Sequence, residues 1–257
     1  MNGELTDDLF FGGRLRLLQP RRGHRVGTDA ALLVAAARSR LAPGAVAADL
    51  GAGVGAVGLA LAHAGAGRVA LVEIDEGLAA IAAENARRNG LEGRAAAACA
   101  DVATLATSRG PAEPAAGSCD LVAFNPPFDD ADRFRLSPDA VKARAHGSPE
   151  GLLGDWTLAA NRLLKPQGDL VMIHRPEALA GILGALDGRF GDVRLLPVHA
   201  RDDAPATRII VAARKGRRGA LALLPPLVMH APAGGFTSEG DAAQRGDATI
   251  ALDRSRP

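Results

Sequence analysis

The sequence has 257 residues, 47% of them hydrophobic, with 30 Lys and Arg against 29 Asp and Glu. This length suits one large domain with its own core, and the net charge of +1 excludes a strongly basic protein overall. Two cysteines exclude a disulfide framework, and neither they nor the six histidines show metal-ligand spacing, so we expect no bound metal.

The amino-terminal segment carries both acidic and basic residues. Glu4, Asp7 and Asp8 leave no basic stretch before an apolar one, so no secretion signal is expected, and no apolar run suggests a membrane span. We therefore expect a soluble, cytoplasmic protein. Five arginines and His24 lie between Arg14 and Arg25 without an acidic residue, which predicts either a solvated arm or a patch that meets phosphates.

Strands and helices are expected to alternate from about residue 28 to about residue 200, which predicts a parallel sheet with helices on both faces. Thr28 is the expected N-cap of the first helix. The predicted helices are 28–41, 55–63, 76–89, 152–164 and one beginning at Pro176. The predicted strands are 46–50, 68–74, 95–100, 118–125, 168–174, 193–199 and 207–214.

The last two strands are joined by residues 200–206 alone, which is too short for a crossover helix. If they pair, the last strand runs antiparallel, and this topology resembles the class I methyltransferases. The expected fold is therefore α/β and Rossmann-like, with a seven-stranded, mostly parallel sheet. We expect one domain, with an entry segment (1–45), a core (46–215) and an extension (216–257). In the extension, residues 221–229 are a candidate strand, and the tail after Ala231 is expected to be partly disordered.

The first predicted strand ends in Asp49-Leu50-Gly51-Ala52-Gly53-Val54-Gly55, and a helix follows. Glycines in such a turn allow the backbone to approach a nucleotide closely, and an acid at the end of the next strand, Glu73, can bind ribose hydroxyls. A dinucleotide-dependent oxidoreductase would share these features. Asp49 argues against it, because a carboxylate beside the turn repels a pyrophosphate and suits the cationic S-adenosylmethionine.

Asp101 follows the third strand and is placed to contact the adenine of that cofactor, or alternatively to cap the helix that begins at Val102. Acidic residues after three successive strands form a pattern that indicates this cofactor more specifically than any one of the three residues does. The expected cofactor site therefore comprises Asp49, Gly51, Ala52, Gly53, Gly55, Glu73, Ile74, Asp101, Val102 and Asn125.

The fourth predicted strand leads into Asn125-Pro126-Pro127-Phe128, the expected catalytic motif. Prolines lack N–H donors and fix the backbone, so the Asn125 side-chain oxygen and the Pro126 carbonyl form a rigid pair of acceptors. Such a pair can grip the two hydrogens of an exocyclic amine and free its lone pair for attack on a sulfonium methyl. Phe128 would stack on the ring of an unstacked base. The alternative interpretation is an ordinary turn, because Asn-Pro dipeptides are common in turns.

The motifs together resemble those of bacterial adenine-N6 methyltransferases that modify the base beside the anticodon of a valine tRNA. The resemblance covers about residues 9–230 and includes the entry segment Gly23–Leu33, the glycine turn, the motif at Asn125, Arg144-Ala145-His146 and Leu163–Gly168. It implies that Gly27, Thr28 and Asp29 help to enclose the methyl donor, although helix capping also explains Thr28 and Asp29. Phe128 stands where relatives often carry Tyr, so a hydroxyl contact would be lost.

RNA, most specifically tRNA, is the expected partner. The candidate RNA-binding residues are Arg14, Arg16, Arg21, Arg22, Arg133, Arg135, Lys142, Arg144 and His146. A solvated surface is the alternative for these residues. The alternative functions are an rRNA guanine-N2 methyltransferase, a protein glutamine-N5 methyltransferase and a non-catalytic RNA-binding protein. The glutamine-N5 enzymes normally carry an N-terminal helical bundle, for which the segment before Val46 leaves little room.

Overall fold

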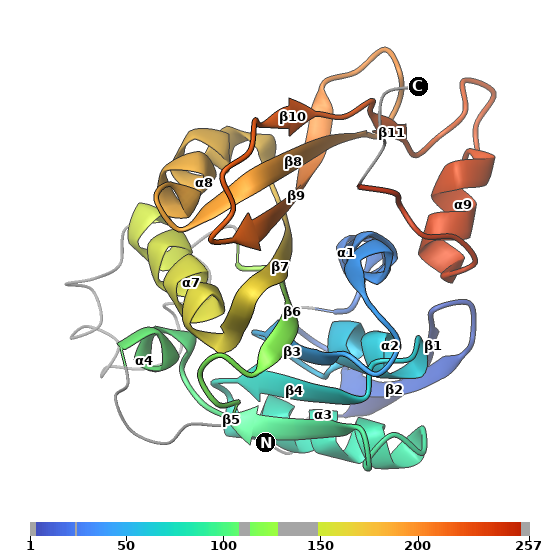
Figure 1. The fold of residues 1–257 in the computed structure, drawn as a ribbon. Coiled ribbons are helices and arrows are strands. Elements are labelled where there is room, and N and C mark those ends of the chain that lie inside the picture. Colours follow the sequence, from blue (N-terminus) through green and yellow to red (C-terminus); the bar gives the residue numbers. More distant parts are fainter. Residues whose placement is uncertain (1–3, 24, 108–113, 128–148, 253–257) are drawn as a thin grey trace.

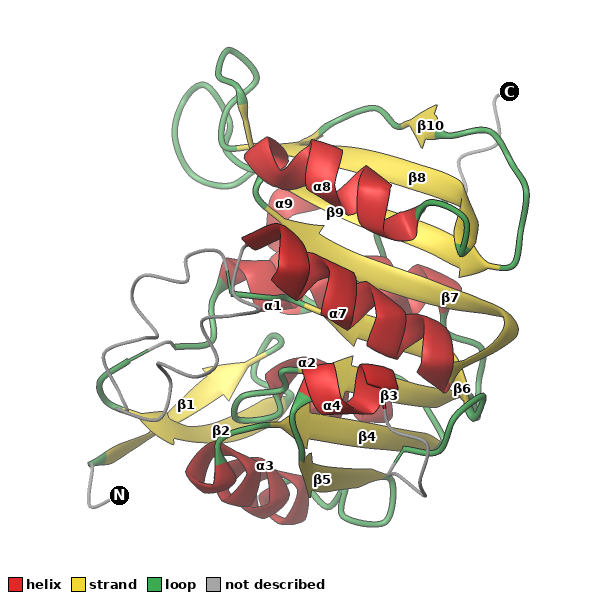
Figure 2. Cartoon of the chain, turned by 90° about the vertical axis from the view of Figure 1, so that its left-hand side faces the viewer, coloured by secondary structure: helices red, strands yellow, loops and turns green. Residues whose placement is uncertain are grey.

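A computed structural model describes residues 4–23, 25–107, 114–127 and 149–252, and its centre is one mixed β-sheet with helices on both faces (Figures 1 and 2). The sheet order is β10-β8-β9-β7-β6-β3-β4-β5, and β11 also pairs with β8. The strands are β3 (Val46–Leu50), β4 (Arg68–Glu73), β5 (Ala95–Cys99), β6 (Cys119–Phe124), β7 (Leu164–His174), β8 (Phe190–His199), β9 (Ala206–Lys215), β10 (Ala222–Leu223) and β11 (Leu227–Val228).

Strand β9 is antiparallel to both neighbours, β7 and β8, as the short connection before it predicts. The other pairings in this sheet are parallel among the described residues. The expected count of seven strands is too low, because the described residues alone form a sheet of nine strands. The candidate strand at 221–229 forms the two short strands β10 and β11, which Pro225 and Pro226 interrupt because proline has no N–H to donate to a ladder.

Each face of the sheet buries its own aliphatic cluster. Helices α1 (Thr28–Ala37), α2 (Ala56–His63), α3 (Glu76–Arg88) and α9 (Ser238–Arg245) cover one face. Helices α4 (Val102–Thr107), α7 (Pro149–Leu163) and α8 (Leu179–Leu186) cover the other. The 3-10 helix η1 (Arg38–Arg40) follows α1, and the 3-10 helix η3 (Pro176–Ala178) precedes α8. No helix of the described residues is long and apolar enough to cross a membrane.

The entry segment contains a hairpin that sequence reasoning missed. Strands β1 (Leu5–Phe10) and β2 (Leu15–Pro20) pair antiparallel in a separate two-stranded sheet. Alternate residues of β2 are buried, but β1 is exposed or half-buried throughout, so it lacks the apolar alternation by which strands are recognised. The hairpin packs through β2 against α3, beside the edge of the main sheet (Figure 1).

One expectation about the start of a helix is wrong, and the tail contains a helix that was not predicted. The N-cap of α1 is Gly27 rather than Thr28, since Gly27 holds the extended backbone (φ −141°) and the helix begins one residue later. The described part of the tail after Ala231 contains α9, which Thr237 caps by accepting from the Gly240 N–H at 3.0 Å. Helix α9 is polar and buries only Gly240 and Ala243, so its sequence carries no clear apolar stripe.

Candidate functional site

The strand ends that carry the sequence motifs lie side by side. Strands β6, β3, β4 and β5 are consecutive parallel neighbours, so their carboxyl ends share one edge of the sheet. The glycine turn follows β3, Glu73 ends β4, Asp101 follows β5 and Asn125 follows β6. Open parallel sheets bind ligands at this edge. The structure therefore assembles these motifs, far apart in the sequence, at one place.

The glycine turn holds a backbone that side chains would oppose. Gly51, Gly53 and Gly55 have φ values of 66°, 55° and 88°, in the left-handed region that glycine tolerates best. A Cβ at Gly53 would meet no atom within 4 Å, so the space beside this residue is open. The geometry fits a ligand that lies directly against the turn.

Glu73 supports the turn as well as facing the ligand edge. Its carboxylate is 3% exposed and accepts from the Gly53 N–H at 2.8 Å and the Asp75 N–H at 3.0 Å. A carboxylate has about four acceptor sites, so ribose hydroxyls can still be bound. The next residue, Ile74, is 59% exposed despite being a large hydrophobe. An adenine ring laid on Ile74 would remove this apolar surface from water.

Asp101 and Val102, which come shortly after β5, have structural roles. Asp101 caps α4, since its Oδ1 accepts from the Ala103 N–H at 2.9 Å, so the capping alternative is realised. Asp101 is exposed, which leaves its second oxygen accessible to a ligand. Val102 is 5% exposed and packs its side chain into the core. A cofactor contact by either residue stays a prediction.

Asp49 lies beneath the turn and is 2% exposed. Its Oδ2 accepts from the Gly58 N–H at 2.8 Å, which joins the end of β3 to the first turns of α2. Burial is the main cause that raises the pKa of Asp49 to about 7; the Gly58 hydrogen bond acts in the opposite direction, and the nearby Glu73 charge adds to the effect of burial. A bound cation above the turn would favour the ionised form.

Asn125 is half-buried and directly follows β6, and Pro126 beside it is buried. The Asn125 Oδ1 is buried and has no hydrogen-bond partner among the described residues. A buried, unpaired carbonyl oxygen is costly unless a ligand donates to it. Phe128, the fourth residue of the motif, lies outside the described residues.

Trp156 of α7 is a site residue that sequence reasoning missed. It is 6% exposed and packs edge-on against Phe124, with 5.7 Å between the ring centroids. The same indole lies directly over Gly51, where an added Cβ would overlap it. Trp156 therefore touches both the glycine turn and the residue before Asn125. No local motif indicates the contact between Trp156 and Gly51, because the two residues lie more than 100 positions apart in the sequence.

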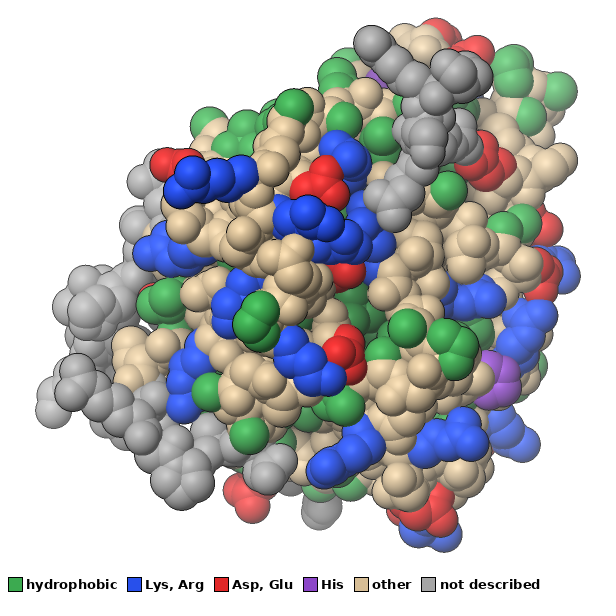
Figure 3. Space-filling view, viewed as in Figure 1, with side chains coloured by type: hydrophobic (Ala, Val, Ile, Leu, Met, Phe, Trp, Pro, Cys, Tyr) green, Lys and Arg blue, Asp and Glu red, His purple; other side chains and the backbone are tan. Residues whose placement is uncertain are grey.

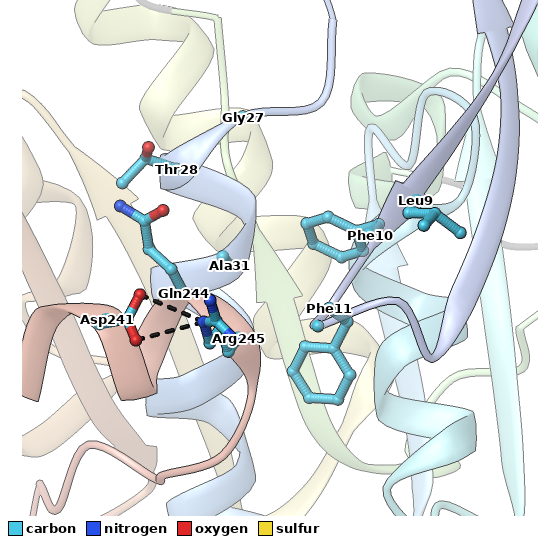
Figure 4. Close-up of a pocket in the computed structure, with 10 residues that line it drawn as sticks. Leu9, Phe10, Phe11, Gly27, Thr28, Ala31, Asp241, Gln244 and Arg245 are labelled. Carbon is cyan, nitrogen blue, oxygen red and sulfur yellow. Dashed lines mark hydrogen bonds and ion pairs between the residues drawn. The ribbon is translucent and has the colours of Figure 1, made fainter.

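The first turn of α1 borders a cavity that lies apart from the glycine turn. Asp29 forms an ion pair with Arg208 of β9 at 2.8 Å. Gly27 and Thr28 line a cavity of about 380 Å³ between the hairpin, α1 and α9 (Figure 4). Phe10 and Phe11 form its apolar wall, and an Asp241–Arg245 ion pair lies opposite, as Figure 4 shows. Enclosure of the methyl donor by Gly27, Thr28 and Asp29 stays a prediction.

The amino-terminal arginines are largely paired with acids. Arg14 pairs with Asp247, Arg16 with Asp7, and Arg21 with Glu4, all at partly exposed positions, while Arg22 is exposed. Lys and Arg side chains are spread over the face in Figure 3, with Asp and Glu beside several of them. Surface ion pairs contribute at most about 1 kcal/mol, so phosphates could compete for these arginines. The other candidate RNA-binding residues lie outside the described ones: Arg133, Arg135, Lys142, Arg144 and His146.

Comparison with known proteins identifies the type of domain. The model of the methyltransferase small domain family matches residues 24–200. Among solved structures, a predicted O-methyltransferase from Agrobacterium tumefaciens is similar, with a TM-score of 0.70 and 28% identity over 86% of this chain and 98% of its own. The search of curated proteins found no match.

Two proteins from Thermus thermophilus share the fold at 21% identity. The 16S rRNA N2 G1207 methyltransferase RsmC, in complex with AdoMet and guanosine, has a TM-score of 0.58 over 82% of this chain and 50% of its own. TrmN has a TM-score of 0.51 over 72% of this chain and 48% of its own. This chain thus matches about half of each Thermus protein. The comparisons confirm the Rossmann-like class I methyltransferase fold and S-adenosylmethionine as the cofactor.

Proposed function

The chain belongs to the methyltransferase small domain family and is an S-adenosylmethionine-dependent methyltransferase, and on this premise we propose that it methylates the exocyclic amino group of a base in RNA. The observation that carries this proposal is the buried Oδ1 of Asn125, which has no hydrogen-bond partner in the part of the chain that the structure describes. It lies at the end of β6, beside the rigid prolines and next to the strand that bears the glycine turn. An amine donor satisfies that oxygen, whereas an ionised hydroxyl acceptor would be repelled by it.

Bound S-adenosylmethionine supplies an electrophilic methyl group on a sulfonium. The residues of this chain hold the acceptor. Asn125 Oδ1 and the Pro126 carbonyl each accept a hydrogen bond from one N–H of the amine. These bonds disfavour the planar, conjugated geometry of the amine and direct its lone pair toward the methyl group. Because Pro126 has fixed φ and Trp156 lies against both Phe124 and Gly51, the acceptor motif and the glycine turn keep a constant separation. Positioning and preorganised dipoles supply most of the rate.

Adenine N6 beside the anticodon of a valine tRNA is the proposed target. The entry segment Gly23–Leu33 supports this choice, because it is the most discriminating part of the resemblance. The proposed phosphate contacts are Arg14, Arg16, Arg21, Arg22, Arg133, Arg135, Lys142, Arg144 and His146. Guanine N2 in rRNA is the second candidate, which the fold shared with the Thermus rRNA N2 G1207 methyltransferase favours.

Asn125 variants test the chemistry. Asn125→Ala removes the acceptor oxygen, and transfer of a labelled methyl group to RNA should fall by at least about 100-fold, the loss typical of one positioned catalytic dipole. Asn125→Asp keeps an oxygen in the same place and should retain more activity than the alanine variant. S-adenosylhomocysteine binding, measured by calorimetry, should persist in both. An alanine variant that transfers methyl groups at the wild-type rate contradicts the mechanism.

A further inference from the structure

Helix α3 holds the hairpin through two asparagine side chains four residues apart. Asn85 accepts from the Leu18 N–H at 2.7 Å and donates to the Leu18 carbonyl at 2.9 Å. Asn89 makes the same pair of bonds with the Arg16 N–H and carbonyl, both at 2.9 Å. Four helical residues rise about 6 Å and two strand residues rise about 6.7 Å, so the two amides match alternate residues of β2. The amides take the place of a neighbouring strand at this edge.

Asn85 differs from Asn89 in a third bond. Its Nδ2 also donates to the Val54 carbonyl at 3.0 Å, inside the glycine turn between Gly53 and Gly55. Asn85 is fully buried and uses both of its amide hydrogens. Asn89 gives its other hydrogen to the Asn85 carbonyl instead. Asn85 therefore connects two separate parts of the molecule, the hairpin and the turn.

The rest of the turn is held from the sheet and from the same face of α3. The Ala52 N–H donates to the Val72 carbonyl at 2.9 Å, and the Gly53 N–H donates to Glu73 at 2.8 Å. A Cβ at Gly55 would lie 3.2 Å from the Cβ of Ala82, one helical turn before Asn85. The Val54 carbonyl is fixed by Asn85, so loss of this amide frees the central peptide of the turn while its two flanks stay anchored.

We propose that Asn85 is a positioning residue, which holds the glycine turn in the geometry that binds S-adenosylmethionine and links that geometry to the docking of the β1–β2 hairpin. A shift of the hairpin moves Leu18, and Asn85 transmits the shift to Val54. Cofactor affinity then depends on how the hairpin is seated, although no residue of the hairpin belongs to the turn. This inference rests on the cofactor and not on the identity of the methyl acceptor.

Asn89→Ala is a matched control for Asn85→Ala, since each variant loses a side-chain amide that is bonded to β2. Of these two side chains, Asn85 is the one that also bonds to the glycine turn. We expect Asn85→Ala to weaken S-adenosylhomocysteine binding by about 3- to 10-fold, the equivalent of one lost hydrogen bond, as measured by calorimetry. Asn89→Ala should stay within about 2-fold of the wild type. In Asn85→Ala, backbone hydrogen exchange should accelerate both in the hairpin and in residues 51–58. In Asn89→Ala, it should accelerate in the hairpin but not in residues 51–58.

Equal S-adenosylhomocysteine affinity in the two variants, or unchanged exchange of residues 51–58 in Asn85→Ala, overturns the proposal. If Asn85→Ala does not fold, Asn85→Ser retains a smaller polar group at this position and is measured against the same control and the same limits. Neither readout requires RNA. A failure of this inference is therefore distinct from a failure of the proposed methyl transfer to RNA.

Discussion

Alanine substitutions at Gly51 and Gly53 separate two effects on stability, the steric overlap with Trp156 and the strain of the backbone. Both residues have positive φ, 66° and 55°, so alanine at either position is strained by about 1–2 kcal/mol. They differ in their surroundings. A Cβ at Gly51 would overlap Cη2 of Trp156 and lie 3.1 Å from its Cζ3, whereas a Cβ at Gly53 would meet no atom within 4 Å.

The magnitudes follow from this contrast. Overpacking a filled site costs about 1–3 kcal/mol, so Gly51→Ala should lower the free energy of unfolding by about 2–5 kcal/mol. Gly53→Ala should lower it by about 1–2 kcal/mol. Trp156→Phe removes the ring atoms that Gly51→Ala would overlap, so the double variant should be more stable than the sum of the single effects predicts, by about 1–2 kcal/mol.

The assay is equilibrium unfolding in urea, followed by circular dichroism because Trp156 is the only tryptophan and its replacement removes the fluorescence signal. Equal destabilisation by Gly51→Ala and Gly53→Ala would refute the packing argument, as would strict additivity of Gly51→Ala with Trp156→Phe. Either result would mean that the indole does not limit the space at Gly51.

Asp49 and the amino-terminal arginines give further predictions. Because the folded pKa of Asp49 is about 7, above its ordinary value of 3.8, stability from its protonated form is present below pH 4 and is lost as pH rises to 7. As pH rises from 5 to 7, the free energy of unfolding of Asp49→Asn, measured in urea, should therefore increase by about 2–3 kcal/mol relative to that of the wild type. If the two proteins show the same dependence of stability on pH, the raised pKa of Asp49 is contradicted. Alanine at Arg14, Arg16, Arg21 and Arg22 should weaken RNA binding and flatten its dependence on salt, and equal affinity at every salt concentration would refute a role of these arginines in RNA binding.

The mostly parallel sheet was predictable from the sequence because the directions of its strands follow from local patterns, whereas the order of the strands was not predicted. The alternation of strands and helices, and the short connection before β9, were enough to predict the parallel strands and the one antiparallel strand. The hairpin and α9 were missed because they are polar or half-exposed, and their stability comes from contacts with the rest of the chain.

The candidate site was predictable to the same extent. The glycine turn, Glu73, Asp101 and Asn125 each stand at the end of a strand, and neighbouring parallel strands bring such ends together. Trp156 and Asn85 support the turn from α7 and α3, and their partners are distant in the sequence. The fit of an indole or an amide to a backbone is a property of tertiary packing, which a single sequence does not display.

The most direct test of the account is the identity of the methylated product. The wild-type protein is incubated with isotopically labelled S-adenosylmethionine and total RNA from a strain that lacks the gene, and the RNA is digested to nucleosides for mass spectrometry. We predict labelled N6-methyladenosine, located in a valine tRNA. Labelled N2-methylguanosine would transfer the assignment to the second candidate. Label confined to O-methylated nucleosides, or no labelled nucleoside at all, would contradict amine methylation of RNA at Asn125.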